Sequence, residues 1–364
     1  MKLDRVQISD FRNLDNLSFK PNKNINVFIG ENGSGKSSIL EALHYLGFAR
    51  SFRTSKHKNV IQAKKNCFTI FCSSKSDDDG SSNKLGISRH RDDSCVVNIN
   101  GIKSKKASDL VSCLPIQIFT PQSSDLLLGA PKLRRRYVDW LLFHVEHAFN
   151  LESSVLSKSL KQLNALYKDK GAKHQDDSYW KDLFCKQSNT ITDYRQNILN
   201  NGLIPMIYSI LTDFLPEFCF EISYYRGWEK ELSLKQCLDK NSLKDRRNGF
   251  VSVGPHKADL RVKIGGIGAH EILSRGQLRM LVASMQLAQT LFLQTITNKP
   301  SIFLLDDIGA ELDEDKRRIF ISRLSQSNTQ LFVTAIDINQ LDFIKNYNEK
   351  TVFHVEHGHV REEI

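Results

Sequence analysis

Residues 30–37 carry the clearest chemical pattern in the sequence, the run Gly30-Glu31-Asn32-Gly33-Ser34-Gly35-Lys36-Ser37. This run fits G-x-x-x-x-G-K-S/T, follows the apolar stretch 25–29 and precedes a segment with helical periodicity. In such a P-loop, glycines let backbone N–H groups surround phosphates, the lysine reaches the β- and γ-phosphates, and the serine hydroxyl contacts Mg²⁺. The sequence therefore predicts a site for ATP and Mg²⁺ here, with Lys36 acting in catalysis.

A second set of candidate residues lies at the end of an apolar stretch, Ile302-Phe303-Leu304-Leu305, which is followed by Asp306-Asp307. Four apolar residues that end in acids are typical of a buried parallel strand that delivers carboxylates to the carboxyl edge of a sheet. Asp306 is the expected partner of Mg²⁺, held through water. Asp307 is placed to orient or deprotonate the attacking water.

A third motif, Leu273-Ser274-Arg275-Gly276-Gln277, opens an apolar helix between these two sites. Taken alone, Ser274 fits an ordinary helix N-cap. The run also resembles the L-S-x-G-Q motif of ABC-type ATPases, where the serine, the glycine and the helix N-terminus face the γ-phosphate bound on the opposite subunit. That resemblance implies ATP contacts across a dimer from Ser274, Gly276 and Gln277.

The segment after the acidic strand resembles the D-loop that crosses the dimer in the same class, and it adds Asp313 to the expected contacts in trans. Thr334-Ala335 occupies the position where transporters of this class usually carry histidine. Asp307 also stands where transporters carry glutamate. The sequence therefore predicts slow ATP hydrolysis.

The elements that must position these residues follow from periodicity. Strands are expected near 3–8, 17–20 and 25–29, and a β meander over 67–102. Helical spacing extends from 131 to about 215, with two apolar stripes that predict a short coiled-coil-like hairpin around the polar loop 169–179. After this lobe, strands are expected at 218–225, 249–264, 301–305 and 330–334. Helices are expected from about 276 and at 315–324, and a hairpin at the C-terminus.

This order predicts an α/β fold, an ABC-type P-loop ATPase head with a second, largely helical lobe. Residues 1–130 and 249–364 would form the ATPase lobe, and residues 131–248 the inserted lobe. No apolar stretch approaches the roughly 20 residues that span a bilayer, so we expect a cytoplasmic protein without a membrane partner. Seven scattered cysteines without a C-x-x-C pair argue against disulfides and zinc.

Positive charge is concentrated in the first third of the chain. Residues 1–136 hold 23 Lys and Arg against 12 Asp and Glu, a net +11 within a total of +10. Solubility alone would explain such an excess, but an anionic partner such as a phosphate backbone explains its clustering better. The basic run from Lys132 through Arg134, Arg135 and Arg136 is a candidate DNA contact, although Arg–carboxylate packing is the alternative for these residues.

Several further segments, together with the motifs above, resemble the RecF family in the SMC-like branch of the ABC-type ATPases. They are 10–13 (Asp-Phe-Arg-Asn), 129–136, 215–218, 226–229 and 254–259 (Gly-Pro-His-Lys-Ala-Asp). The resemblance covers nearly the whole chain. It implies a weak DNA-stimulated ATPase that dimerises with ATP on double-stranded DNA near single-strand gaps. It further implies work with RecR and RecO to place RecA on SSB-coated single strands, in replication, repair and SOS induction.

Four residues keep two interpretations each. Gln122 either is a Q-loop ligand or has no such role, since similar proteins often carry glutamate at this point. Arg12 either approaches the nucleotide or is an ordinary surface arginine. His256 and Lys257 form a structural turn by default, with polar contact to the nucleotide site as the alternative. Two other functions compete with the repair ATPase: the cassette of an ABC-type transporter, and a structural SMC-like clamp, which would need longer coiled-coil arms.

Overall fold

The computed structural model describes residues 2–75, 82–104, 106–169, 177–338, 341, 344, 347 and 349–363. The chain forms two compact units. Unit 1 comprises Met1–Ser123 and Met285–Ile364, and unit 2 comprises Ser124–Ser284. Within the described ranges, no helix is both long and apolar enough to cross a membrane.

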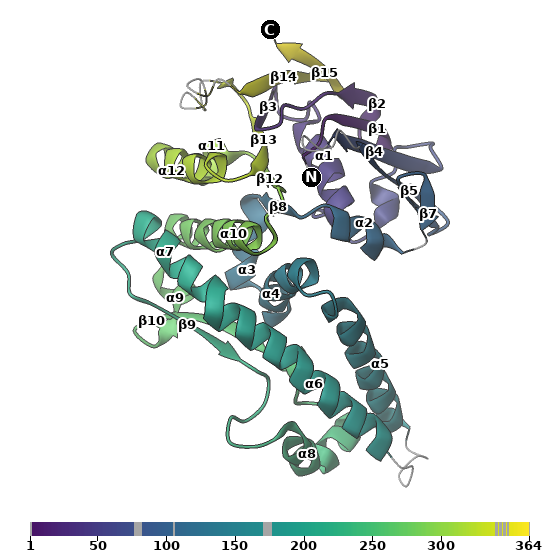
Figure 1. Ribbon diagram of the computed structural model, residues 1–364, viewed down its shortest axis with the longest axis vertical. Helices are drawn as coiled ribbons and strands as arrows, with labels where there is room; N and C mark the ends of the chain where they lie inside the picture. The colour runs from purple at the N-terminus through teal and green to yellow at the C-terminus, as the bar shows by residue number, and fades with distance from the viewer. Residues whose placement is uncertain are drawn as a thin grey trace. The chain divides into compact units, whose positions relative to one another are not determined.

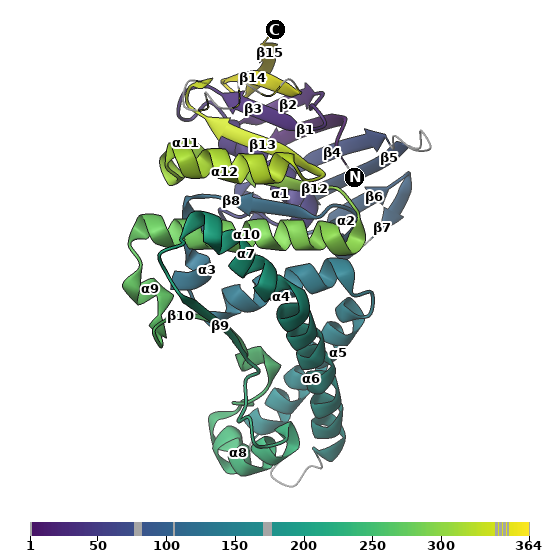
Figure 2. The same ribbon diagram turned by 60° about the vertical axis from the view of Figure 1, so that its left-hand side comes forward.

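Unit 1 contains a mostly parallel sheet in the order β15-β14-β3-β13-β12-β8 (Figure 2). Its strands are β3 (Ile25–Ile29), β8 (Ile116–Phe119), β12 (Ser301–Leu305), β13 (Thr329–Ala335), β14 (Lys350–Glu356) and β15 (His359–Glu363). Every residue of β3, β12 and β13 is buried, as expected for parallel strands covered on both faces. β15 pairs antiparallel with β14, whereas the other neighbours pair in parallel.

A second sheet of unit 1 is antiparallel and has the order β2-β1-β4-β5-β6-β7. Its strands are β1 (Arg5–Phe11), β2 (Leu14–Phe19), β4 (Cys67–Lys75), β5 (Ser82–His90), β6 (Cys95–Ile99) and β7 (Ile102–Ser104). Helix α1 (Lys36–Phe48) joins the two sheets, because Leu40 and Leu43 share one hydrophobic core with Phe68 of β4 and Phe332 of β13. Helix α12 (Glu314–Ser325) packs on the parallel sheet, where the Phe320 ring meets Phe119 and Phe303. The short helices α2 (Ala107–Cys113) and α11 (Ile308–Glu311) complete this unit.

Unit 2 is mainly helical. Helices α5 (Phe149–Lys168) and α6 (Ser178–Ile198) lie side by side as a hairpin (Figure 1). The other helices are α3 (Asp125–Leu128), α4 (Pro131–Val145), α7 (Ile204–Phe214), α8 (Leu234–Asn248) and α9 (Ala269–Ile272). A three-stranded antiparallel sheet has the order β11-β10-β9, with β9 (Phe220–Tyr225), β10 (Asp259–Ile264) and β11 (Ile267–Gly268). The boundary between the units falls within helix α10 (Arg275–Thr297).

The predicted fold class, helical hairpin and terminal strand pair are all present, and the structure differs from the prediction in several elements. The prediction of a strand over 249–264 is wrong for its first part. Gly254 and Pro255 begin a 3₁₀ turn there, and only β10 is a strand. Helices α2 and α8 and strand β8 were not predicted. The second compact unit spans Ser124–Ser284, and the predicted helical lobe covers 131–248 of it; β10 pairs with β9 within this unit. Residues 170–176 of the predicted hairpin loop and 76–81 of the meander lie outside the described residues.

Candidate nucleotide-binding site

The P-loop and the ends of β12 and β13 surround a cavity of about 360 Å³ in unit 1. Parallel pairing of β13 with both β3 and β12 brings the carboxyl ends of all three strands to one edge, the edge where α/β sheets bind ligands. The cavity is lined by Asn13, Asn32, Gly33, Gly35, Lys36, Ser37, Ser38, Arg53, Asp306, Asp307, Thr334, Ala335 and Ile336. The predicted residues Lys36, Ser37, Asp306 and Asp307 therefore share one cavity.

Lys36 is the buried cation of this cavity. Its Nζ donates hydrogen bonds to the carbonyl oxygens of Gly30 at 2.6 Å and Glu31 at 2.8 Å. Burial lowers the pKa of Lys36, and the nearby carboxylates of Asp307 and Asp306 oppose that shift. The P-loop backbone thus keeps the ammonium group at the place where an anion would neutralise it.

Asp306 accepts hydrogen bonds from hydroxyl groups of two other segments. Its Oδ1 accepts hydrogen bonds from Ser37 Oγ and from Thr334 Oγ1, both at 2.9 Å. Burial raises the pKa of Asp306, and these two hydrogen bonds act in the opposite direction. Thr334 Oγ1 also accepts from the backbone N–H of Asp307 at 2.9 Å, which anchors Asp307 in a left-handed conformation with φ of 53°.

The donor set of this cavity fits ATP with Mg²⁺. Carboxylate and hydroxyl oxygens, here from Asp306 and Ser37, are the hard ligands that Mg²⁺ prefers, and one or two carboxylates suffice when phosphate oxygens complete the coordination. Lys36 and the free N–H groups in the first turn of α1 provide the complementary positive potential for phosphates. Asn13 and Arg53 border the same cavity, and Arg53 adds a second cation that no sequence motif indicated.

The C-terminal hairpin supports the P-loop from outside. The N–H of Gly358, in the turn between β14 and β15, donates to the carbonyl of Ser34 at 2.8 Å. A Cβ at Gly358 would stand 2.3 Å from the carbonyl oxygen of Asn13, and a Cβ at Gly30 would stand 2.3 Å from that of Val355. No sequence motif revealed this contact between segments more than three hundred residues apart.

The residues predicted to act across a dimer have local roles in their own chain. Ser274 and Gln277 form a capping box at the start of α10, in which Ser274 N donates to Gln277 Oε1 at 3.0 Å and Gln277 N donates to Ser274 Oγ at 3.3 Å. Gly276 is exposed, and beyond its chain neighbours and the backbone of its own helix no described atom lies within 4 Å of a Cβ added to it. Asp313 caps α12 by accepting from Lys316 N at 2.9 Å.

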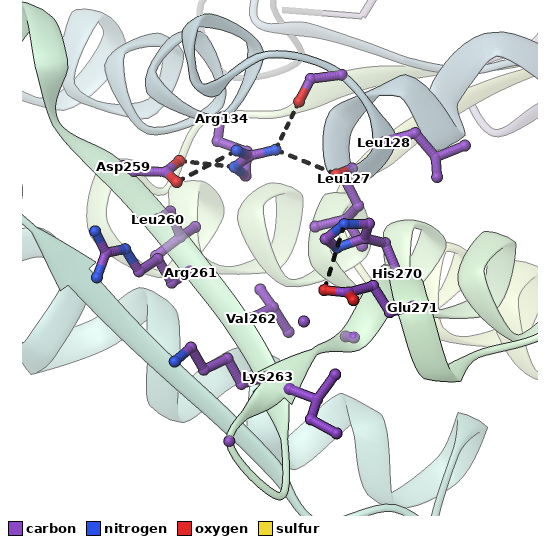
Figure 3. Close-up of a pocket in the computed structure, with 15 residues that line it drawn as sticks. Leu127, Leu128, Arg134, Asp259, Leu260, Arg261, Val262, Lys263, His270 and Glu271 are labelled. Carbon is purple, nitrogen blue, oxygen red and sulfur yellow. Dashed lines mark hydrogen bonds and ion pairs between the residues drawn. The ribbon is translucent and has the colours of Figure 1, made fainter.

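Of the four basic DNA candidates, two are engaged within unit 2. Arg134 pairs with Asp259 at 2.7 Å and donates to the carbonyls of Leu127 and Gly129 at the edge of a cavity of about 420 Å³ (Figure 3). Arg135 donates to the carbonyl of Ala258 at 2.7 Å. Lys132 and Arg136 are exposed. The packing alternative therefore describes the first pair, and the second pair can still meet DNA.

The four ambiguous residues fall as follows. Gln122 is exposed and does not line the nucleotide cavity. Arg12 binds the buried carboxylate of Glu41. The side chain of His256 is held in a turn by a 3.0 Å hydrogen bond between its Nε2 and the carbonyl of Val251. Burial lowers the pKa of His256 to about 4. Lys257 lies 5.5 Å from the centre of the Phe250 ring. The structural interpretation of the last two agrees with these contacts.

Replacing Gly358 by alanine tests the support of the P-loop by the hairpin. The new methyl group would clash with the Asn13 carbonyl, so we expect Gly358→Ala to weaken binding of ATP with Mg²⁺ by about tenfold, measured by calorimetry. Gly101→Ala is the matched control. Gly101 has a similar φ of 87°, but apart from its chain neighbours no described atom lies within 4 Å of its added Cβ, so this variant should lose stability without losing ATP affinity. Equal ATP affinity in the two variants would contradict the role of the hairpin.

Comparison with known proteins shows the family of the chain. The family model for the RecF/RecN/SMC N terminal domain matches residues 2–361. The DNA replication and repair protein RecF of Pseudoalteromonas atlantica is 59% identical over the full length of both chains. RecF of Psychromonas ingrahamii is 38% identical over 99% of each.

Solved structures show the same fold. A structure of the recombination mediator protein RecF with ATP, from the RecFOR pathway, aligns over 100% of this chain and 98% of its own with a TM-score of 0.88 at 23% identity. An SMC head bound to the C-terminal winged-helix domain of ScpA aligns over 100% and 97% with a TM-score of 0.60 at 14% identity. The predicted ABC-type head is thus confirmed as the fold. The chain belongs to the RecF family of DNA replication and repair proteins.

Proposed function

We propose that this protein is a DNA-binding ATPase of recombinational repair and replication, in which ATP closes a homodimer on double-stranded DNA near single-strand gaps. The observation that carries the proposal is the convergence of Ser37, Asp306 and Thr334 beside the buried ammonium of Lys36. Three segments far apart in the sequence supply a metal-binding carboxylate and a phosphate-binding cation to one cavity. That combination is specific to a Mg²⁺-dependent nucleotide site.

The residues of the cavity suit slow hydrolysis. Bound ATP with Mg²⁺ would supply the phosphoryl group and the charge that neutralises it. Lys36 and Arg53 would stabilise negative charge that develops on the phosphate oxygens, since both are cations that border the cavity. Asp307, held by Thr334 through its backbone, would orient the attacking water. Thr334 stands where a histidine would otherwise assist, so turnover should be slow unless DNA stimulates it.

The start of α10 is suited to cap a nucleotide bound by a second copy of the chain. Gly276 is exposed in its own chain, and outside its own helix no described atom lies within 4 Å of a Cβ added there. The chain's own packing therefore gives no reason for glycine at this position, whereas close approach to an external phosphate does. Ser274, Gln277 and the D-loop residue Asp313 would complete the composite site. ATP would then favour the dimer by binding it more tightly than the monomer, and hydrolysis would release it.

The proposal that the protein binds DNA is supported by its excess of basic residues. The net +11 of residues 1–136 and the exposed cations Lys132 and Arg136 favour contacts with the phosphate backbone. Family membership extends the proposal to RecR and RecO as partners, to loading of RecA on SSB-coated single strands, and to SOS induction.

Substitution of Gly276 tests the composite site. Gly276→Gln adds a side chain into open space, so we expect stability to change by less than about 0.5 kcal/mol while ATP-dependent dimerisation is lost. Sedimentation at micromolar concentration with ATP and Mg²⁺ measures this: the parent should be a dimer and the variant a monomer. Gly276→Ala, which adds only a methyl group, should show an intermediate effect. A fully dimeric Gly276→Gln variant would refute the proposed contact in trans.

Salt dependence tests the contact with DNA. We expect the affinity for duplex DNA to fall at least tenfold between 50 and 200 mM salt, and DNA to stimulate ATP hydrolysis. A Lys132→Gln/Arg136→Gln variant should bind more weakly and reduce the slope of log affinity against log salt by about one to two. Lys240→Gln, which removes an exposed lysine paired with Glu229, is the control. Affinity that does not respond to salt would argue against phosphate contacts.

A further inference from the structure

Helix α1 contains a fully buried carboxylate, Glu41, five residues after Lys36. Burying a carboxylate costs free energy unless the carboxylate is paired, and Glu41 accepts several hydrogen bonds. Arg12 donates to it through Nε at 3.0 Å and Nη2 at 2.7 Å, and Ser51 Oγ donates at 2.5 Å. Arg53 Nη1 lies 3.8 Å from its other oxygen. Of these residues, Arg53 lines the nucleotide cavity, whereas Glu41, Arg12 and Ser51 are not among its lining residues.

Both loops that Glu41 holds border the nucleotide cavity. Arg12 precedes Asn13, which lines the cavity and accepts a hydrogen bond from Ser38 Oγ at 2.8 Å. Ser51 begins the loop that carries Arg53. The Ser51 hydroxyl accepts from the backbone N–H of Arg53 at 2.9 Å and from that of Thr54 at 3.0 Å while it donates to Glu41. One carboxylate on the P-loop helix therefore fixes the backbone on each side of the site.

The charges in this network leave Arg53 available. The two-point hydrogen bonding of Arg12 already balances the charge of Glu41, with the Arg12 side chain 25% exposed. Arg53 approaches Glu41 only to 3.8 Å and its side chain is 51% exposed. Glu41 therefore holds the loop of Arg53 through Ser51, and no hydrogen bond from the guanidinium group of Arg53 is needed for this. A contact of Arg53 with phosphate would not leave Glu41 unpaired.

We propose that Glu41 is a positioning residue of the nucleotide site, which presents Arg53 to the triphosphate bound at Lys36 by anchoring the loop 51–54. The inference rests on the proposed function for the binding of ATP, and it assigns a specific role to a residue outside the P-loop motif. Glu41 acts through the Ser51 hydroxyl and the Arg12 guanidinium and does not contact the nucleotide.

A double-mutant cycle on ATP affinity tests this role in the full-length protein. Arg53→Ala should weaken binding of ATP with Mg²⁺ by about tenfold, the effect of one charge-assisted contact. Glu41→Gln, which preserves side-chain size, should have a similar effect in the parent but change affinity less than about twofold in the Arg53→Ala background. Effects that multiply in the double variant would overturn the proposal, because Glu41 would then act independently of Arg53.

Two further variants keep the result interpretable. Ser51→Ala removes the link to the loop without unpairing the buried charge, so it can replace Glu41→Gln in the cycle if that variant does not fold. Ser51→Ala should show the same coupling to Arg53. Asp245→Asn alters another buried acid, which accepts from Ser252 N in unit 2, and should lower the melting temperature while ATP affinity is unchanged. If Ser51→Ala changes affinity equally with and without Arg53, the proposal is wrong. A parent that binds no ATP would instead refute the proposed function.

Discussion

The Asp306 carboxylate, buried where β12 ends, is the interaction on which the site depends. It accepts from Ser37 at the start of α1 and from Thr334 at the end of β13, so a single oxygen joins three segments of the chain. The parallel register makes this possible, because Leu305 pairs with Val333 and Ala335 pairs with Ile29. Without that register the P-loop would remain a phosphate-binding turn with no metal-binding partner.

Charge in the site is held by the surrounding backbone and by a second layer of side chains. The ammonium of Lys36 rests on two P-loop carbonyls, the loop of Arg53 is tied to Glu41, and Gly358 of the C-terminal hairpin holds the P-loop at Ser34. Such preorganisation matters because a binding site that is already formed loses less entropy when its ligand arrives. The site therefore depends on both ends of the chain, although the motif that identifies it spans only residues 30–37.

The parts of the site that could be predicted are those with a short-range signature. The P-loop has a fixed spacing, and the run before Asp306 has the apolar character of a buried parallel strand. The role of Thr334 was missed because a threonine at a strand end has no distinctive pattern, and Arg53 was missed because its position depends on the tertiary contact of Ser51 with Glu41. The pairing of β9 with β10, which places 259–264 in the same compact unit as 220–225, likewise acts over a long separation. Contacts between distant segments leave no local period in the sequence.

We propose that two chains share each nucleotide site. Mixing two chains that are defective in opposite halves tests it most directly: one carries Lys36→Ala and the other Gly276→Gln. A shared site predicts that neither variant dimerises with ATP and Mg²⁺ alone, but that the mixture forms a heterodimer and regains hydrolysis, because one intact P-loop then faces one intact α10. A mixture that stays monomeric, with activity no greater than the sum of its parts, would show that each chain works alone.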